Sequence, residues 1–253
     1  MVKKNNSTRF GHILKLLDNE YARVVADGTI ADVAGFIDTG SYSLNALISG
    51  SIFKGMPGNK ITAIAGEEAT GKTFFALGIA KHFLDTHEDN LVLVFETEGS
   101  VTKDIAIARG LDGSRVLSVP VTTVQTFKTQ ALRLVDDYLI TPEKDRVPYL
   151  FVLDSLGMLS TSKEMADSQE GKEVKDMTRT AEIKACFRVL TNKLSLAKIP
   201  FIVTNHVYQT MGMFPTKEMG GGGGLKYAAN NIIALSKSKE KDAEGNLVGA
   251  LIR

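Results

Sequence analysis

The chain of 253 residues has little of what several classes of protein require. Its single cysteine, Cys186, excludes an internal disulfide framework and a cysteine-based metal site. None of its four histidines has the HExxH spacing of a zinc site. No run of about 18 apolar residues is present, so we expect no transmembrane helix. Residues 1–10 are polar and lack the apolar stretch of a secretory signal, so we expect a cytoplasmic protein.

An excess of charge is missing as well. The sequence holds 30 basic and 29 acidic residues, a formal net charge of +1, which implies no overall attraction to nucleic acid or membrane. Any polyanion must therefore be held by a local site. The length fits one α/β domain with a sizeable core and a small appendage.

Short apolar runs predict strands that are buried on both faces, as in a parallel sheet. Stretches with the period of a helix lie between these runs. The alternation predicts an α/β fold, a mostly parallel sheet flanked by helices. The predicted strands are Ile61–Ala65, Leu91–Phe95, Val116–Val119, Tyr149–Leu153, Pro200–Thr204 and Asn231–Leu235, and the predicted helices are Lys72–Asp85, Val101–Arg109, Val124–Ile140 and Asp176–Ala197.

The beginning of the chain differs from the rest. Apolar side chains recur at helical spacing in Phe10–Ala26, which predicts an amphipathic helix. The Gly-, Asp- and Thr-rich segment Asp27–Tyr42 predicts a linker or an isolated strand. We therefore divide the chain into an arm, residues 1–40, and a core, residues 41–253. The residues alone allow the arm to pack on its own domain or to dock on a partner.

Two segments interrupt the α/β alternation, and we expect both to be loops. Gly157–Lys175 carries charges of both signs, so its residues favour an ordinary solvated loop over a nucleic-acid contact. His206–Gly224 ends in consecutive glycines, which would let the backbone approach phosphates, although a flexible polar loop explains them equally well. Long loops in compact domains commonly carry function.

The most specific motif is a phosphate-binding loop that matches GxxxxGK[ST] between a predicted strand and a predicted helix. Its glycines let backbone N–H groups point at phosphate oxygens. Lys72 offers an ammonium to the β- and γ-phosphates, and Thr73 offers a hydroxyl to Mg²⁺. The motif predicts binding of ATP with Mg²⁺ by Gly66, Glu67, Glu68, Ala69, Thr70, Gly71, Lys72 and Thr73.

Acidic residues follow two of the predicted strands. Asp154 ends an apolar run, at the edge of the sheet where α/β proteins bind ligands, and we expect it to hold Mg²⁺ together with Thr73. Glu96 and Glu98 follow another run, and either could orient an attacking water. The alternative is that these glutamates belong to the N-terminal cap of the next helix.

A further polar pair, Asn205 and His206, ends the predicted strand Pro200–Thr204. Such a pair can hydrogen-bond a γ-phosphate and report its loss to the following loop. Taken alone, the two residues favour the simpler explanation, a satisfied polar pair at a strand end.

Together and in this order, the motifs resemble the RecA/Rad51 recombinase family, especially the UvsX-type recombinases of T4-like bacteriophages. The resemblance runs from about Asp38 to the end and includes the N-terminal helix. The segments that carry it are Thr39–Asn45, Gly55–Lys60, Gly66–Thr73, Glu96–Glu98, Leu153–Ser155 and Asn205–His206, supported by Asp176–Arg179, Phe187–Arg188 and Met213–Phe214.

The resemblance implies a RecA-like P-loop NTPase core and roles for single residues. It implies that Glu98 is the catalytic glutamate, Asp154 the Walker B aspartate and His206 the sensor of the γ-phosphate. It implies that the two interrupting segments bind DNA, that Tyr227 lies near a subunit interface, and that the arm docks on the neighbouring protomer. The residues we expect to contact DNA are Arg179, Arg188, Met213, Phe214 and Lys217.

The function implied is that of an ATP-dependent DNA recombinase. Such a protein forms homo-oligomeric filaments on single-stranded DNA and promotes strand exchange with homologous duplex DNA, coupled to ATP hydrolysis. Mediator and single-strand-binding proteins are the expected partners, and the host cytoplasm is the expected location for a phage-encoded chain. The chain stops at Arg253, before the last core strands and C-terminal region that the resemblance implies.

Two other functions remain open from the sequence. One is a RecA-like motor that assembles as a ring and acts as a helicase or loader. The other is a non-catalytic fragment that caps or regulates the filament of a full-length recombinase.

Overall fold

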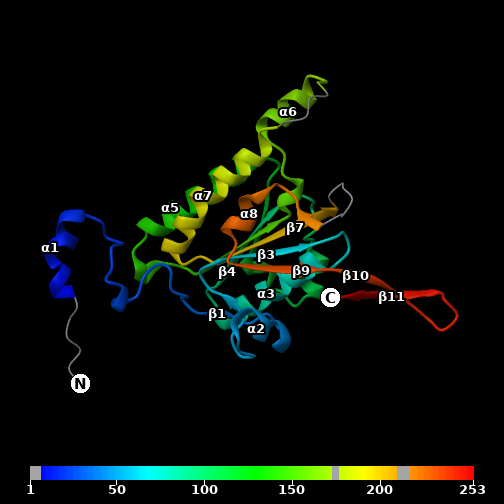
Figure 1. The fold of residues 1–253 in the computed structure, drawn as a ribbon, viewed down its shortest axis with the longest axis horizontal. Coiled ribbons are helices and arrows are strands. Elements are labelled where there is room, and N and C mark those ends of the chain that lie inside the picture. Colours follow the sequence, from blue (N-terminus) through cyan, green and yellow to red (C-terminus); the bar gives the residue numbers. More distant parts are fainter. Residues whose placement is uncertain (1–6, 173–176, 210–216) are drawn as a thin grey trace.

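A mostly parallel sheet forms the centre of the computed structural model, which describes residues 7–172, 177–209 and 217–253 (Figure 1). Within these ranges the sheet has seven strands, and all are parallel except β8, which pairs antiparallel with β7. The α/β fold and all six expected strands are confirmed. In spatial order the strands are β5 (Val116–Pro120), β4 (Leu91–Glu96), β6 (Tyr149–Asp154), β7 (Phe201–Gln209), β3 (Ile61–Gly66) and β9 (Asn231–Leu235), with β8 (Lys217–Met219) beside β7.

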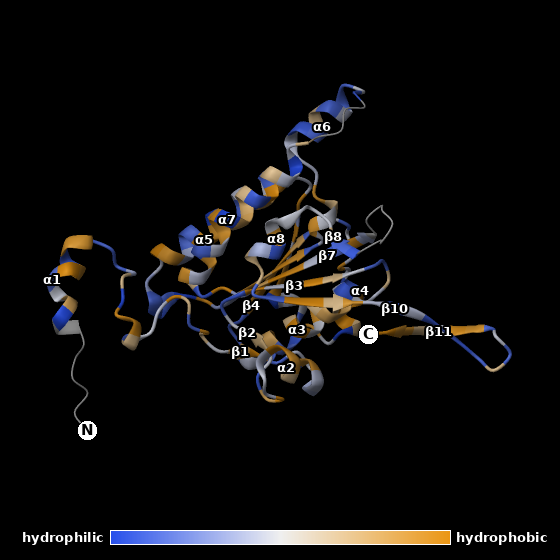
Figure 2. Ribbon diagram, in the orientation of Figure 1, coloured by the Kyte–Doolittle hydropathy of each residue, from blue (hydrophilic) through white to orange (hydrophobic). Residues whose placement is uncertain are grey.

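Helices cover both faces of this sheet, and the central strands β3, β4 and β6 are hydrophobic and buried along almost all of their length (Figure 2). On β3, Ile61 and Ala63 belong to one hydrophobic core, whereas Ile64 belongs to the other. This burial on both faces explains the continuous apolar runs in the sequence. The first core packs under α5 (Val124–Ile140), α7 (Arg179–Ala197) and α8 (Gly223–Ala228), and the second under α3 (Lys72–Thr86) and α4 (Lys103–Ala108).

The first interrupting segment is not the loop that we expected. It contains a 3₁₀ turn, η4 (Leu156–Met158), and a helix, α6 (Ser162–Gln169), which extends beyond α7 away from the sheet (Figure 1). The Thr161 hydroxyl caps α6 by accepting a hydrogen bond from the Glu164 amide at 3.0 Å. Threonine followed three residues later by glutamate is a capping-box pattern, so the sequence did contain a signal for this helix.

The described residues of the second interrupting segment are also mostly in strands and a helix. Strand β7 continues to Gln209, and β8 returns beside it, with Val207 opposite Met219. We refer to β7 and β8 as the β7–β8 hairpin. The last two glycines of the run lie in α8. Met213 and Phe214 lie outside the described residues.

The N-terminal helix α1 spans Ser7–Leu17, so our expectation that it reaches Ala26 was wrong. Asp18, at φ 44°, has a left-handed backbone conformation that cannot continue a helix. For the segment that follows we expected a linker or an isolated strand, and it does contain a strand: Phe36 and Ile37 form β1, which is not isolated because it pairs with β2. In Figure 1, α1 lies apart from the sheet.

Smaller elements complete the described parts of the chain. They are η1 (Val25–Asp27), β1 (Phe36–Ile37), α2 (Tyr42–Ser49), β2 (Met56–Pro57), η2 (Gly113–Arg115), η3 (Glu143–Asp145), β10 (Lys237–Lys241) and β11 (Leu247–Ile252). The antiparallel pair β10–β11 projects from the sheet (Figure 1). Among the described residues, no helix has the length and apolar character needed to span a membrane.

Candidate active site

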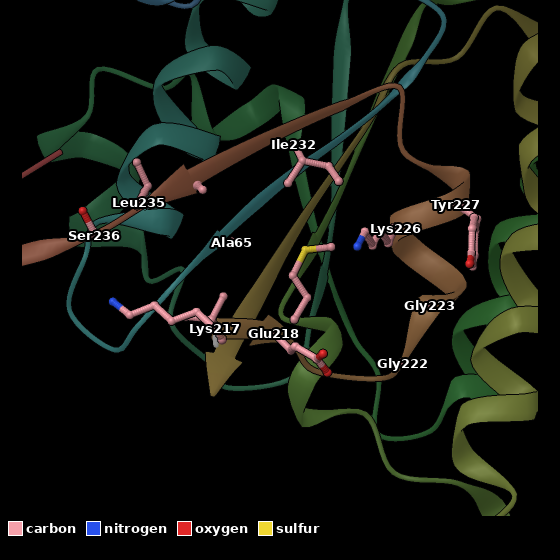
Figure 3. Close-up of a pocket in the computed structure, with 13 residues that line it drawn as sticks. Ala65, Lys217, Glu218, Gly222, Gly223, Lys226, Tyr227, Ile232, Leu235 and Ser236 are labelled. Atoms are coloured by element: carbon pink, nitrogen blue, oxygen red, sulfur yellow. The ribbon is translucent and has the colours of Figure 1, made fainter. Parts of the chain in front are cut away.

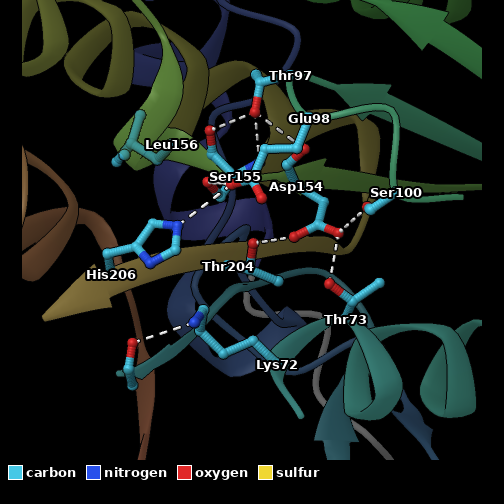
Figure 4. Close-up of polar contacts among 12 residues, drawn as sticks. Lys72, Thr73, Thr97, Glu98, Ser100, Asp154, Ser155, Leu156, Thr204 and His206 are labelled. Carbon is cyan, nitrogen blue, oxygen red and sulfur yellow. Dashed lines mark hydrogen bonds and ion pairs between the residues drawn. The ribbon is translucent and has the colours of Figure 1, made fainter. Parts of the chain in front are cut away.

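The polar ends of four parallel strands meet at one edge of the sheet (Figure 4). The register places Gly66 of β3 beside His206 of β7, and Glu96 of β4 beside Asp154 of β6. Thr97, just after β4, joins two of these ends because its hydroxyl accepts a hydrogen bond from the Ser155 amide at 2.8 Å. Parallel pairing alone therefore brings the predicted site residues together.

The phosphate-binding loop curves between β3 and α3. Its glycines are required by shape, because a Cβ at Gly66 would lie 2.5 Å from Thr70 Oγ1 and Gly71 has φ +85°. The buried Lys72 ammonium spans the curve and donates to the carbonyls of Gly66 at 3.1 Å and Glu67 at 2.8 Å. Burial lowers the pKa of Lys72, although the charges of Glu98 and Asp154 oppose that shift. The loop thus curves around a cation of the kind that binds phosphates.

Oxygen atoms suited to Mg²⁺ lie at the start of α3 and the end of β6. The Thr73 hydroxyl donates to Asp154 Oδ2 at 2.7 Å, and the Ser100 hydroxyl donates to the same oxygen at 3.0 Å. The Thr204 hydroxyl donates to Asp154 Oδ1. Mg²⁺ in nucleotide sites is held by one or two carboxylates together with phosphate oxygens, and this set of ligands fits that chemistry.

Glu98 lies across the edge from this group and is held by two donors. The Ser155 hydroxyl donates to Glu98 Oε1 at 2.6 Å, and His206 Nε2 lies 3.2 Å from the same oxygen. Burial alone would raise the pKa of Glu98, but the hydrogen bonds from Ser155 and His206, with the charges of His206 and Lys72, lower it below its ordinary value. The carboxylate is therefore ionised at neutral pH, as an acceptor of a water proton must be.

The structure distinguishes the two glutamates that the sequence left equivalent. Glu96 is buried and accepts hydrogen bonds from the Val101 amide at 2.6 Å and the Ser118 hydroxyl at 3.1 Å. It therefore fixes the segment that leads into α4, although the N-cap of that helix is Thr102 rather than either glutamate. Glu98 is the glutamate that faces His206.

The β7–β8 hairpin is attached to this edge. The buried Asn205 donates from its amide to the Gly220 carbonyl at 2.9 Å, and the Gly220 amide donates to the His206 carbonyl at 2.9 Å. The Asn205 amide nitrogen is thus a satisfied donor, but its buried Oδ1 has no hydrogen-bond partner among the described residues, so the pair is not fully satisfied. The His206 side chain points to Glu98. At the start of β8, Lys217 forms an ion pair with Glu67 of the phosphate-binding loop, at 2.6 Å.

The remaining residues expected to contact DNA lie on α7. Arg179 is half-buried and donates to the carbonyls of Leu159 at 2.8 Å and Gly157 at 2.7 Å, so it holds the turn before α6. Arg188 is exposed and borders a hollow of about 370 Å³ that Tyr227 of α8 also lines. The structure does not bring these two arginines to the phosphate edge.

Sequence reasoning missed four hydroxyl residues of the site: Thr97, Ser100, Ser155 and Thr204. Ser155 and Thr204 each adjoin a residue that we had selected, Asp154 or Asn205, at the end of a strand. Position at that edge was the available signal, and we applied it only to charged and amide side chains.

The glycine loop between strand and helix, with acidic strand ends beside it, defines a P-loop α/β protein. Residues 10–253 match the family model of the RecA N-terminal domain, and the chain belongs to that family. The resemblance found in the sequence is therefore confirmed.

Three relatives illustrate the similarity. The chain is 31% identical over 199 residues to the "Recombination and repair protein" of Enterobacteria phage T4, covering 79% of this chain and 49% of that protein. It is 26% identical over 223 residues to "Protein RecA" of Malacoplasma penetrans (strain HF-2), covering 85% and 64%. It is 26% identical over 229 residues to "DNA repair protein recA homolog 3, mitochondrial" of Arabidopsis thaliana, covering 85% and 48%. The chain thus spans about half to two thirds of the length of these relatives.

Proposed function

We propose that the chain is the ATPase core of a DNA recombinase, which forms filaments on single-stranded DNA and promotes strand exchange with a homologous duplex. One observation carries the proposal: Lys72, Asp154, Glu98 and His206 meet at one edge, and the strand of His206 continues into the β7–β8 hairpin. The printed names of the relatives, a recombination and repair protein and RecA proteins, support it.

Different residues of the edge have different roles in the hydrolysis of ATP. Backbone amides of Gly66–Thr73 and the Lys72 ammonium bind the phosphates, and Thr73 and Asp154 hold Mg²⁺. When bound there, Mg²⁺ would neutralise negative charge on the phosphate oxygens. Glu98 accepts a proton from a water and orients that water for in-line attack on the γ-phosphate.

His206 connects this chemistry to DNA. Its ring contacts Glu98 while its backbone carbonyl holds Gly220 at the end of the hairpin. A γ-phosphate beside His206 would rearrange that contact and order the hairpin, and hydrolysis would reverse the change. The proposed DNA contacts remain Arg179, Arg188, Met213, Phe214 and Lys217.

We assign the two parts of the chain different tasks in the filament. The arm, residues 1–40, docks on the neighbouring protomer through α1, whose Leu16 and Leu17 are 71% and 58% exposed. The core, residues 41–253, binds nucleotide and DNA, and Tyr227, 87% exposed, lies at the protomer contact. Mediator and single-strand-binding proteins act on the assembled filament.

An ATPase assay with and without single-stranded DNA tests this function. We expect DNA to stimulate hydrolysis, and Lys72→Ala to abolish both hydrolysis and ATP-stimulated DNA binding. Equal DNA binding by the variant and the parent, with and without ATP, would contradict the coupling. Rings instead of filaments in electron micrographs would indicate the motor function.

A further inference from the structure

The β7–β8 hairpin has two strands, and each is joined to the phosphate site by a carboxylate. Strand β7 is joined through His206 and Glu98, as described above. Strand β8 is joined through Lys217, its first residue, to Glu67, the first residue after β3. The proposed function gives Lys217 only the role of a DNA contact, and its ion pair with Glu67 has no part in that function so far.

The geometry of β8 selects this partner for Lys217. Figure 3 shows the Lys217 side chain leaving β8 toward the turn that follows β3, while Glu218 points elsewhere. Successive side chains of a strand point to opposite faces, so only one of these two residues can reach the loop. The two side chains line a cavity of about 570 Å³ between the hairpin, α8 and β9.

Glu67 is close to the position that bound phosphates would occupy. Its own carbonyl oxygen accepts the Lys72 ammonium at 2.8 Å, while its carboxylate accepts Lys217 at 2.6 Å. The hydrogen bond and charge of Lys217 lower the pKa of Glu67, so the carboxylate is ionised at neutral pH. One residue of the loop therefore contacts both the phosphate-binding lysine and the hairpin.

We propose that Lys217 is a positioning residue, which ties β8 to the phosphate-binding loop through Glu67, so that nucleotide binding acts on both strands of the hairpin. The inference rests on the proposed function. Displacement of the loop or of Lys72 by a nucleotide moves Glu67, and the ion pair transmits that movement to the start of β8. His206 transmits the effect of the nucleotide to the other strand of the hairpin, β7.

Direct contact between Lys217 and a DNA phosphate is the competing role. The two roles predict different effects of Glu67→Gln, one on DNA affinity itself and the other on how much the nucleotide changes that affinity. If Lys217 serves only as a DNA contact, removal of the Glu67 carboxylate releases a cation and deletes a nearby negative charge, so DNA binding strengthens. If the ion pair is a tether, the same change weakens the response of DNA binding to nucleotide.

The experiment measures binding of the full chain to a fluorescein-labelled oligo(dT) by anisotropy. Each protein is measured with Mg²⁺ alone and with Mg²⁺ and a saturating non-hydrolysable ATP analogue, and the ratio of the two Kd values is the coupling. We expect Glu67→Gln and Lys217→Glu each to lower the coupling by about two- to fivefold, since exposed ion pairs contribute little more. The double exchange Glu67→Lys with Lys217→Glu should restore it.

Two control variants separate the tether from a general change of charge. Glu218→Gln removes a carboxylate from the neighbouring position of β8, and Lys237→Gln removes a lysine that donates to the Glu68 carbonyl at 2.5 Å but does not belong to the hairpin. Both should keep the coupling of the parent. Titration of the analogue into each variant without DNA establishes that the nucleotide site is filled.

The outcomes distinguish the two proposals. Unchanged coupling in Glu67→Gln, or tighter DNA binding by the same factor with and without the analogue, overturns the tether and leaves the recombinase function in place. Failure of the double exchange to restore coupling also overturns it. If the DNA affinity of the parent protein does not change with the nucleotide, both the tether and the proposed recombinase function are overturned.

Discussion

The phosphate edge and the β7–β8 hairpin adjoin each other but are held in different ways. At the edge, the Asp154 carboxylate accepts three hydroxyl donors and lies on a strand that is buried along almost all its length. In the hairpin, β7 is a central strand of the sheet as far as His206, whereas β8 pairs, among the described strands, only with the end of β7 and is otherwise held by separate polar contacts of Asn205 and Lys217. Groups that carry out chemistry need fixed positions, whereas a segment that responds to a ligand needs contacts that exchange readily.

The largest effect is expected when the proposed base at the phosphate edge is removed and the contacts of the hairpin are kept. Glu98→Gln keeps the size of the side chain but cannot accept a proton, so we expect kcat for ATP hydrolysis to fall by about 10²–10⁴-fold. Nucleotide-stimulated DNA binding should persist, because the amide oxygen of the variant can still accept a hydrogen bond from His206 and the ion pair of Lys217 is intact. Steady-state ATPase and DNA anisotropy measurements check the two expectations, and equal loss of both would contradict the division.

A core substitution beneath both regions should destabilise them together. Phe201 is fully buried at the start of β7 and contacts the rings of Phe127, Phe151 and Phe187. Phe201→Ala should lower the free energy of unfolding by about 3–5 kcal/mol through lost contacts and a cavity. Urea denaturation followed by circular dichroism measures it. A loss below about 1 kcal/mol would mean that the core collapses around the vacancy.

A change in the donors of Glu98 should appear in the pH profile. Ser155→Ala removes one hydrogen bond that lowers the pKa of Glu98, while the burial that raises this pKa remains. The carboxylate of the variant is then protonated at a higher pH, so the acid limb of the kcat profile moves upward in pH. Ser100→Ala, which affects Asp154 instead, is the matched control. An acid limb in the same place for Ser155→Ala and the parent would contradict the assignment.

The smallest effect is expected within the hairpin. Asn205→Ala removes the hydrogen bond to the Gly220 carbonyl, a net contribution of about 1 kcal/mol. Amide exchange in β8 should become about fivefold faster, while exchange in β3 and β6 should not change. Mass-spectrometric hydrogen exchange measures this difference, and uniform acceleration across the sheet would show that the hairpin is not a separate unit.

Most of the fold could be predicted from the sequence, since each strand of the main parallel set is an apolar run with a helical stretch beside it. The errors occurred where the chain leaves that rhythm. Helix α6 is polar, so no apolar periodicity in the sequence predicts it. The only local signal for this helix is the capping pattern of Thr161 and Glu164. The hairpin was hidden because β8 is short and has no apolar alternation to identify it.

The sequence alone determined the phosphate-binding loop, the acidic strand ends and the α/β alternation, because each depends on residues that are neighbours in the chain. Only the tertiary structure decided that Glu98 faces His206 while Glu96 accepts hydrogen bonds from Val101 and Ser118, and that Lys217 meets Glu67. These choices depend on which strands pair, in which register and how the side chains rotate. Residues far apart in the sequence carry no local signal of such a meeting, because it is the packing of the whole sheet that brings them together.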